Sequence, residues 1–219
     1  MAKIPQIGSA EQLIPQIVRA ISSLPTPAYI AIDGPSGSGK STLARQLRQH
    51  FPDSLLLEVE EWAAGWEDLA GAVVRLTKVV EDLRATAEFS PLNSRAVSAN
   101  LDSRAVSADR KTSPLTTDLD LDPDPTPVAT SRWDWQKNSW RKAEKLYPAP
   151  LTFLTGCASA ALPVDLIIWI EAPADIRRAR TARRDSYNWS SYWNIWAEQE
   201  AEIATRFHSR ENADFILST

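Results

Sequence analysis

The sequence predicts an α/β fold in which a five-stranded parallel sheet is sandwiched by helices. Short apolar runs, typical of buried strands, alternate along the chain with segments of helical periodicity, and this alternation is typical of parallel sheets. A glycine-rich loop joins the first of these runs to a helix. The 219 residues, 43% of them hydrophobic, suffice for the core of a single domain spanning residues 1–219.

The first half of the chain predicts helices and strands in turn. Ser9 can cap a helix over residues 9–23, and Pro15 lies within its apolar pattern, where it can bend or break the helix. The apolar run 29–32 is expected to be the first strand, followed by a helix over about 39–50. The next expected elements are a strand over 54–59 and an amphipathic helix over 67–84.

The second half predicts three more strands, over residues 151–155, 165–171 and 213–217. The middle one is apolar on both faces, as parallel strands covered by helices are. Helices are expected over 173–184 and about 190–208. The latter carries an apolar stripe that indicates core packing and contains Trp189, Trp193, Trp196, Ile203 and Phe207.

Between these halves, residues 88–131 differ in character. The hexamer at 94–99 recurs at 103–108, and an Asp- and Pro-rich run follows at 118–127. Phe89 is the one aromatic residue in about 88–130, so this segment has little to bury. We expect a disordered insertion over 88–131 in a core made of 28–87 and 132–217.

Composition limits the class of protein. A net charge of −4 argues against a general nucleic-acid partner or an acidic membrane surface. The sequence shows neither a signal-peptide pattern nor an apolar run long enough to cross a membrane, and we expect a soluble cytoplasmic protein. Cys157, the single cysteine, has no His or Lys near it in the sequence and is expected to be a small buried residue.

The most informative motif fits G-x-x-x-x-G-K-[ST], the phosphate-binding loop, and lies between a predicted strand and a predicted helix, as the motif requires. Its glycines allow backbone N–H groups to point at phosphate oxygens, and the following helix adds the positive end of its dipole. Lys40 would reach the β- and γ-phosphates of ATP, and the Ser41 hydroxyl would hold Mg²⁺. The expected ATP-binding residues are Gly34, Pro35, Ser36, Gly37, Ser38, Gly39, Lys40, Ser41 and Thr42.

The remaining motifs favour a small phosphotransferase. The Asn-Lys-x-Asp sequence that reads guanine in GTPases is absent, as is the second glycine-rich signature of transport ATPases. Glu60 and Glu61 follow the second strand at the carboxyl edge of the sheet, where they can orient an acceptor or a metal-bound water. A solvated acidic loop is the alternative.

Arginines and tryptophans supply two further candidate sets. Arg180 and Arg184 share a helix face with Arg177 and can clamp a transferred phosphoryl group, unless this is an ordinary solvated basic face. The sequence Trp133-Asp134-Trp135 can stack on a planar base and accept hydrogen bonds from a small-molecule acceptor, and core packing is equally consistent with it.

Together these motifs resemble the uridine kinase-like family of phosphate-loop kinases, in particular its small actinobacterial-type members described as ATP-binding proteins. The resemblance covers about residues 28–86 and 132–217 and rests on the phosphate loop, Glu60-Glu61 before Gly65-Trp66, Trp133-Asp134-Trp135, Glu171-Ala172-Pro173 and Arg180-Thr181-Ala182-Arg183-Arg184-Asp185. It implies the P-loop NTPase fold of nucleoside and nucleoside-monophosphate kinases, with ATP as phosphate donor and Mg²⁺ as cofactor.

The resemblance also implies roles for single residues. Lys40, Glu60, Arg180 and Arg184 would be catalytic, Glu60 would serve as base and lie near the metal with Ser41, and Glu61 would belong to the acceptor side with the Trp-Asp-Trp sequence.

Two departures from the family pattern bear on turnover. Glu60 and Glu61 stand where the family has aspartates, and Thr155-Gly156 stands where it has Glu-Gly. Displacement of a carboxylate by about one ångström can cost about 10²-fold in rate. Three functions are therefore open: a kinase acting on a nucleoside, nucleotide or similar hydroxyl acceptor; a catalytically weakened ATP-binding protein that acts through an unidentified partner; and a plain ATP hydrolase.

Overall fold

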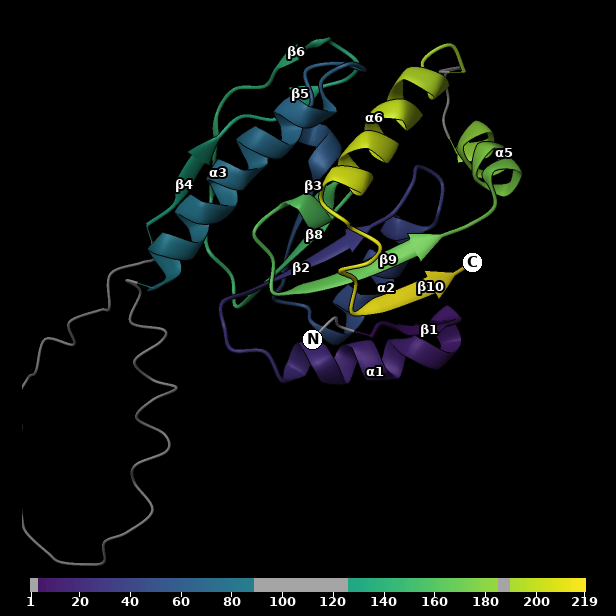
Figure 1. Cartoon of the computed structure of the whole chain (residues 1–219). Helices are drawn as coiled ribbons and strands as arrows, with labels where there is room; N and C mark the ends of the chain where they lie inside the picture. The colour runs from purple at the N-terminus through teal and green to yellow at the C-terminus, as the bar shows by residue number, and fades with distance from the viewer. Residues whose placement is uncertain (1–3, 89–125, 185–189) are drawn as a thin grey trace, which may run out of the picture.

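A computed structural model of the chain (Figure 1) describes residues 4–88, 126–184 and 190–219. Its centre is a parallel sheet of six strands in the order β1-β10-β9-β2-β8-β3. The five predicted strands are all present and are β2 (Ala28–Asp33), β3 (Leu55–Glu58), β8 (Leu151–Thr155), β9 (Leu166–Glu171) and β10 (Phe215–Ser218). The predicted α/β fold with a parallel sheet is confirmed.

The sixth strand, β1 (Gln6–Gly8), pairs with β10 at one edge and was not predicted. It is only three residues long, and the side chain of Ile7 is 65% exposed. A strand this short and this exposed has no hydrophobic alternation by which to recognise it.

The helices cover both faces of the sheet (Figure 1). On one face, α1 (Ala10–Ser22) and α2 (Lys40–His50) pack on the sheet, and their apolar residues share a core cluster with Ile30 and Ile32 of β2. On the other face, α3 (Leu69–Glu88) and α6 (Trp193–Arg206) share a second cluster with Leu57 and Leu154. Helix α5 (Ala174–Arg184) follows β9 beyond the carboxyl edge of the sheet.

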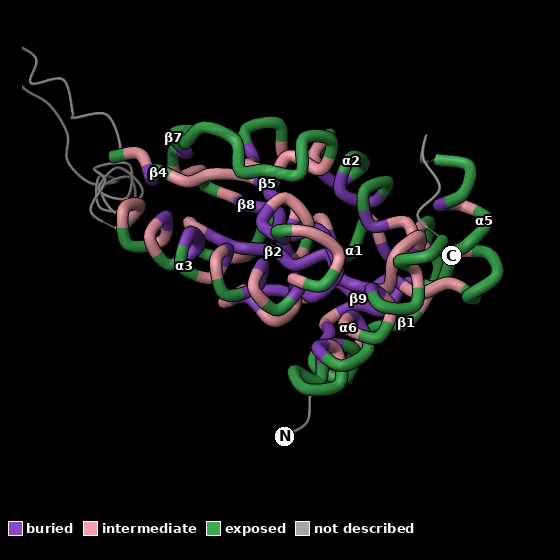
Figure 2. Tube along the Cα trace, turned by 90° about the horizontal axis from the view of Figure 1, so that it is seen from above, coloured by how far each residue is buried: buried purple, intermediate pink, exposed green. Residues whose placement is uncertain are grey.

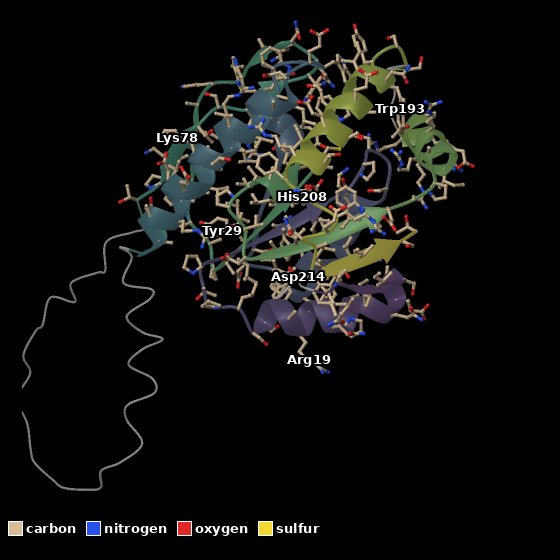
Figure 3. All side chains as sticks on the ribbon, in the orientation of Figure 1. Arg19, Tyr29, Lys78, Trp193, His208 and Asp214 are labelled. Carbon is tan, nitrogen blue, oxygen red and sulfur yellow. The ribbon has the colours of Figure 1, made fainter. Side chains whose placement is uncertain are left out.

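The outer faces of these helices are polar, as their periodicity predicts. Arg19 of α1 and Lys78 of α3 project into solvent on opposite sides of the molecule (Figure 3). The strands between them are buried, whereas exposed residues lie on the periphery (Figure 2). Helix α1 continues through Pro15 without a break, and a capping box of Ser9 and Gln12 fixes its start.

Two small two-stranded antiparallel sheets stand beside α3 (Figure 1). They pair β4 (Val128–Thr130) with β7 (Glu144–Leu146) and β5 (Trp133–Asp134) with β6 (Ser139–Trp140). Most of the predicted insertion, residues 89–125, lies outside the described residues, but the end of the predicted range contains β4.

Within the three described ranges, none of the helices combines the length and apolar character needed to span a membrane.

Candidate nucleotide and acceptor site

The phosphate loop connects the end of β2 to the start of α2 and curls around the first turn of that helix. Gly34, Gly37 and Gly39 all have positive φ angles, of 137°, 79° and 112°. A Cβ atom at Gly34 would collide with the backbone of Ile170, and one at Gly37 with the backbone of Arg177. Glycine is therefore required at both positions for conformation and for space.

The loop leaves the start of α2 open to an anion. Gly39 is the N-cap residue and contributes no side-chain hydrogen bond, so the first amides of α2 and the positive end of its dipole face the loop. The loop holds its own shape through hydrogen bonds from Ser38 N–H to the Pro35 carbonyl and from Thr42 N–H to the Gly39 carbonyl.

Lys40 lies under the loop, 8% exposed. Its Nζ donates to the carbonyl oxygens of Gly34 (2.7 Å) and Pro35 (3.2 Å) and to Sγ of Cys157 (3.2 Å). Burial acts to lower the pKa of Lys40, but the neighbouring Cys157, Glu60 and Glu200 outweigh it and raise the pKa above its ordinary value. Lys40 therefore remains an ammonium ion at neutral pH.

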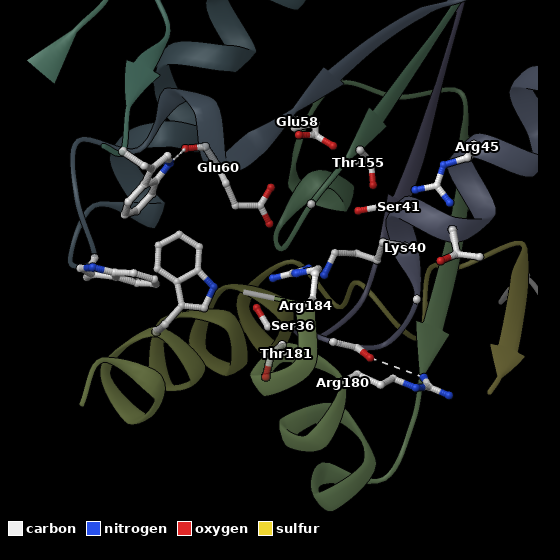
Figure 4. A pocket seen from close by; sticks show the side chains of 17 residues that line it. Ser36, Lys40, Ser41, Arg45, Glu58, Glu60, Thr155, Arg180, Thr181 and Arg184 are labelled. Atoms are coloured by element: carbon white, nitrogen blue, oxygen red, sulfur yellow. Dashed lines mark hydrogen bonds between the residues drawn. The ribbon is translucent and has the colours of Figure 1, made fainter. Parts of the chain in front are cut away.

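A pocket of about 610 Å³ opens in front of the loop, at the carboxyl edge of the sheet (Figure 4). Ligands bind at this edge in open α/β sheets because the loops that follow the strands meet there. The residues that line the pocket are Ser36, Gly37, Gly39, Lys40, Ser41, Thr42, Arg45, Glu58, Glu60, Trp66, Trp135, Thr155, Gly156, Arg180, Thr181, Arg184 and Trp196.

Glu60 enters this pocket from a 3₁₀ turn, η1 (Val59–Trp62), directly after β3. Its Oε1 accepts a hydrogen bond from the backbone N–H of Cys157 at 3.1 Å, and its carboxylate lies over Gly156. A Cβ atom at Gly156 would occupy the same space as the Glu60 carboxylate. The longer side chain of glutamate is thus held in one position by the end of β8.

Tryptophans from three separate segments meet next to Glu60. The ring of Trp66 lies 4.9 Å from that of Trp135 and 5.8 Å from that of Trp196, measured between centroids. The indole N–H of Trp135 donates to the Glu60 carbonyl at 3.0 Å. Tyr192 stacks on Trp66 at 5.1 Å. We call these four residues the aromatic cluster, and its three tryptophans line the pocket next to Glu60.

The predicted arginines lie at the loop. Arg180 donates to Oγ1 of Thr219 at 2.9 Å, and that hydroxyl donates to the Ser38 carbonyl at 2.9 Å. Arg184 also lines the pocket. Arg177, in the first half of α5, donates to the Ser36 carbonyl at 3.0 Å and so connects this helix to the loop.

Other predicted site residues lie away from this pocket. Glu61 forms an ion pair with Arg132 (2.6 Å). Trp133 is buried and packs edge-on against Trp140, and Asp134 accepts hydrogen bonds from the backbone of the following turn, which lower its pKa. Of the Trp-Asp-Trp sequence, the structure places Trp135 in the pocket. Gly34 and Pro35 line a second pocket of about 390 Å³ behind the loop.

The structure adds two residues to the site that no sequence motif indicates. Arg45 lines the pocket, and Glu200 of α6 accepts hydrogen bonds from the Ser36 N–H at 3.1 and 3.2 Å. Neither belongs to a short motif, so only the tertiary contact reveals it. Glu58, Thr155 and Trp196 also line the pocket, although the sequence predicts no binding role for them.

Asp33 is a further buried group that the sequence did not single out. Its carboxylate accepts hydrogen bonds from the N–H groups of Gly34 (2.6 Å), Ala158 (3.0 Å) and Ala160 (3.0 Å). Burial raises the pKa of Asp33 to about 6, against the lowering effect of these bonds. This carboxylate joins the phosphate loop to the turn after β8.

The residues present fit ATP and Mg²⁺. The glycine-lined loop and the buried ammonium of Lys40 match phosphate oxygens. Ser41 and the carboxylates supply the oxygen ligands that Mg²⁺ takes, usually together with waters and substrate phosphates. Within the described residues, no group of three or more His, Cys, Asp or Glu side chains could hold a metal by itself. A metal here would therefore depend on phosphate oxygens as well.

No protein-family model matches the chain, and no curated protein does. A solved structure described as a possible uridine kinase from Bacillus stearothermophilus does match, with a TM-score of 0.52 and 16% identity over 94% of this chain and 98% of that one. The chain shares the α/β fold of that protein.

Two other solved structures are similar at lower scores. A putative fructose transport system kinase from Silicibacter sp. TM1040 has a TM-score of 0.49 and 15% identity, over 92% of this chain and 97% of that one. A shikimate kinase from Acinetobacter baumannii has a TM-score of 0.44 and 16% identity, over 92% and 87%.

Proposed function

We propose that this chain is an ATP- and Mg²⁺-dependent phosphotransferase that transfers the γ-phosphate of ATP to a hydroxyl of a nucleoside, a nucleotide or a similar small acceptor. The observation that carries the proposal is one pocket with two different walls. The phosphate loop and Lys40 form one wall, and a fixed carboxylate, Glu60, stands with the aromatic cluster on the other.

On the donor side, the loop amides and Lys40 would hold the β- and γ-phosphates. Lys40 can exchange its present acceptors, the Gly34 and Pro35 carbonyls, for phosphate oxygens with little movement. Arg184, which also lines the pocket, would neutralise negative charge on the transferred phosphoryl group. When bound, Mg²⁺ supplies further positive charge at the β- and γ-phosphates, with Ser41 among its ligands.

On the acceptor side, Glu60 would orient the attacking hydroxyl and take its proton. Its Oε1 is engaged by the Cys157 N–H, which fixes the carboxylate while Oε2 faces Gly156. The ring of Trp135 is part-exposed and lines the pocket, so a planar ring of the acceptor could stack on it at a centroid distance of about 4.5–7 Å.

A specific observation also supports the second candidate function, an ATP-binding protein with weakened transfer that acts through a partner. Thr155 lines the pocket at the position where the family resemblance implies a glutamate. This change would lower turnover and leave the phosphate loop intact.

One assay separates these functions. The protein is incubated with γ-labelled ATP, Mg²⁺ and a panel of nucleosides and nucleotides, beside Lys40→Ala and Glu60→Gln variants. Transfer of label to an acceptor, abolished in Lys40→Ala and reduced at least about 10²-fold in Glu60→Gln, supports the kinase. ATP binding with no labelled acceptor supports the second candidate. Release of free phosphate alone indicates a hydrolase.

A further inference from the structure

Two strands end next to each other at the floor of the pocket, and each carries an oxygen-bearing side chain at its last residue. Glu58 ends β3 and Thr155 ends β8, and the two are register partners in the parallel sheet. Register partners on neighbouring strands point to the same face of a sheet. Both residues line the pocket together with Ser41 (Figure 4).

Thr155 has a buried hydroxyl that no described residue satisfies. The residue is 2% exposed, and its Oγ1 makes no hydrogen bond within the described part of the chain. A buried hydroxyl without a partner costs free energy, so its retention calls for a ligand. Because Thr155 lines the pocket, a ligand bound there is in a position to satisfy Oγ1.

Glu58 and Glu60 stand in different surroundings, although only Val59 separates them. Glu60 is bonded to Cys157 and lies against Trp135. Glu58 is half-buried and faces the side of the pocket where Ser41 and Thr155 lie (Figure 4). The two carboxylates are therefore directed to different parts of the site.

We infer that Glu58 and Thr155 complete the Mg²⁺ site of Ser41, with the Glu58 carboxylate as its anionic group and the Thr155 hydroxyl as a hydrogen-bond partner for a metal-bound water. This inference rests on the proposed binding of ATP with Mg²⁺. Mg²⁺ in nucleotide sites usually keeps several waters and binds one or two carboxylates plus phosphate oxygens, which is the set available here. Glu60 is then not needed as a metal ligand and can orient the acceptor hydroxyl.

The test measures the affinity for ATP by isothermal titration calorimetry, once with Mg²⁺ and once with EDTA. For the native sequence we expect Mg²⁺ to tighten ATP binding. In Glu58→Gln we expect this gain to fall about tenfold, with the affinity in EDTA unchanged within about twofold, because only a metal ligand has been lost. Thr155→Val should lose a smaller part of the gain. Glu67→Gln, which alters an exposed carboxylate on the same segment, should keep all of it.

A double variant makes the test specific. Because Glu58 and Thr155 are register partners, Glu58→Gln with Thr155→Glu moves the carboxylate to the adjacent strand and should restore most of the gain. Thermal unfolding without nucleotide checks that each variant is folded. An equal Mg²⁺ gain in Glu58→Gln and the native protein, or no gain in the native protein, would overturn the inference.

Failure of the proposed transfer reaction would give a different result from failure of the proposed metal site. If no acceptor becomes labelled but the Mg²⁺ gain depends on Glu58, the metal site stands and the kinase activity does not.

Discussion

The roles of single residues at this site depend on their surroundings in the folded protein as well as on their side-chain chemistry. The sequence does not distinguish Asp33 from other acidic residues, but in the structure its carboxylate is buried and accepts hydrogen bonds from three backbone N–H groups. From the sequence, Gly156 would be interpreted as a glycine of a turn, but in the structure its missing side chain leaves the space that the Glu60 carboxylate occupies. Each role leads to a measurable effect.

Asp33 should make stability depend on pH. Its pKa is 3.8 when unperturbed and about 6 in the folded protein. Between these values the unfolded chain has released the proton and the folded chain retains it, so stability falls as pH rises through this window and then levels off. Asp33→Asn removes this dependence and, because an amide cannot accept all three bonds, costs about 1–3 kcal/mol.

Urea unfolding of both proteins between about pH 4 and pH 8 checks this prediction. The stability difference in favour of the native protein should shrink by on the order of 1 kcal/mol per pH unit inside the window and stay constant above it. Parallel stability curves for the two proteins across the whole range would contradict it.

Gly156→Ala should displace Glu60. The new methyl group would strain a backbone with φ of 132° and collide with the carboxylate, so we expect acceptor phosphorylation to fall about 10²-fold while ATP affinity changes little. Gly65→Ala is the matched control, because Gly65 also has a positive φ (104°) but nothing within 4 Å of an added Cβ. Steady-state kinetics and calorimetry measure the two effects. Equal losses of activity in both variants would mean that backbone strain alone is responsible.

At the scale of elements, helix α6 does more than cover the sheet. Trp196 on this helix belongs to the aromatic cluster, and Glu200, one turn later, reaches the phosphate loop. One helix thus contacts both the aromatic cluster and the phosphate loop. The sequence stripe that predicts core packing for this helix accounts for Trp196 and Ile203 but not for Glu200.

Glu200→Ala should loosen the loop, since the Ser36 N–H and hydroxyl and the Cys157 thiol all bond to this carboxylate. We expect a loss of about 1–3 kcal/mol in stability, because buried donors are left without an acceptor. Glu200→Gln keeps one oxygen and should lose less. Glu202→Ala, at an exposed position of the same helix, should lose almost nothing. Urea unfolding ranks the three, and a Glu200→Ala stability equal to that of Glu202→Ala would refute the anchoring role.

At the scale of the whole molecule, the sheet order brings the parts of the site together. Strand β2 lies between β9 and β8, and β3 follows β8. The phosphate loop after β2, the carboxylates after β3 and the turn after β8 therefore meet at one edge of the sheet. The phosphate-loop side of the pocket comes from one continuous stretch of chain, whereas the side of Glu60 and the tryptophans is assembled from η1, β8, the β5–β6 hairpin and α6.

The sequence by itself determined the parallel α/β fold, the five longer strands, and the phosphate loop with Lys40 and Ser41. These features depend on neighbours within a few residues: apolar runs, helical periodicity, and glycines at fixed spacing before a lysine. The bounds of the predicted helices and strands lie within a few residues of the observed ones, whereas β1 and the small antiparallel pairs β4–β7 and β5–β6 were not predicted.

Only the tertiary structure decided which side chains share the pocket. Glu60 and Glu61 are adjacent in sequence, yet one bonds to Cys157 inside the site and the other to Arg132 outside it. Cys157 has no lysine nearby in sequence, yet it contacts Lys40 across 117 positions. Strand register and the direction of each side chain set such contacts, and neither is encoded in the residues next to the pair.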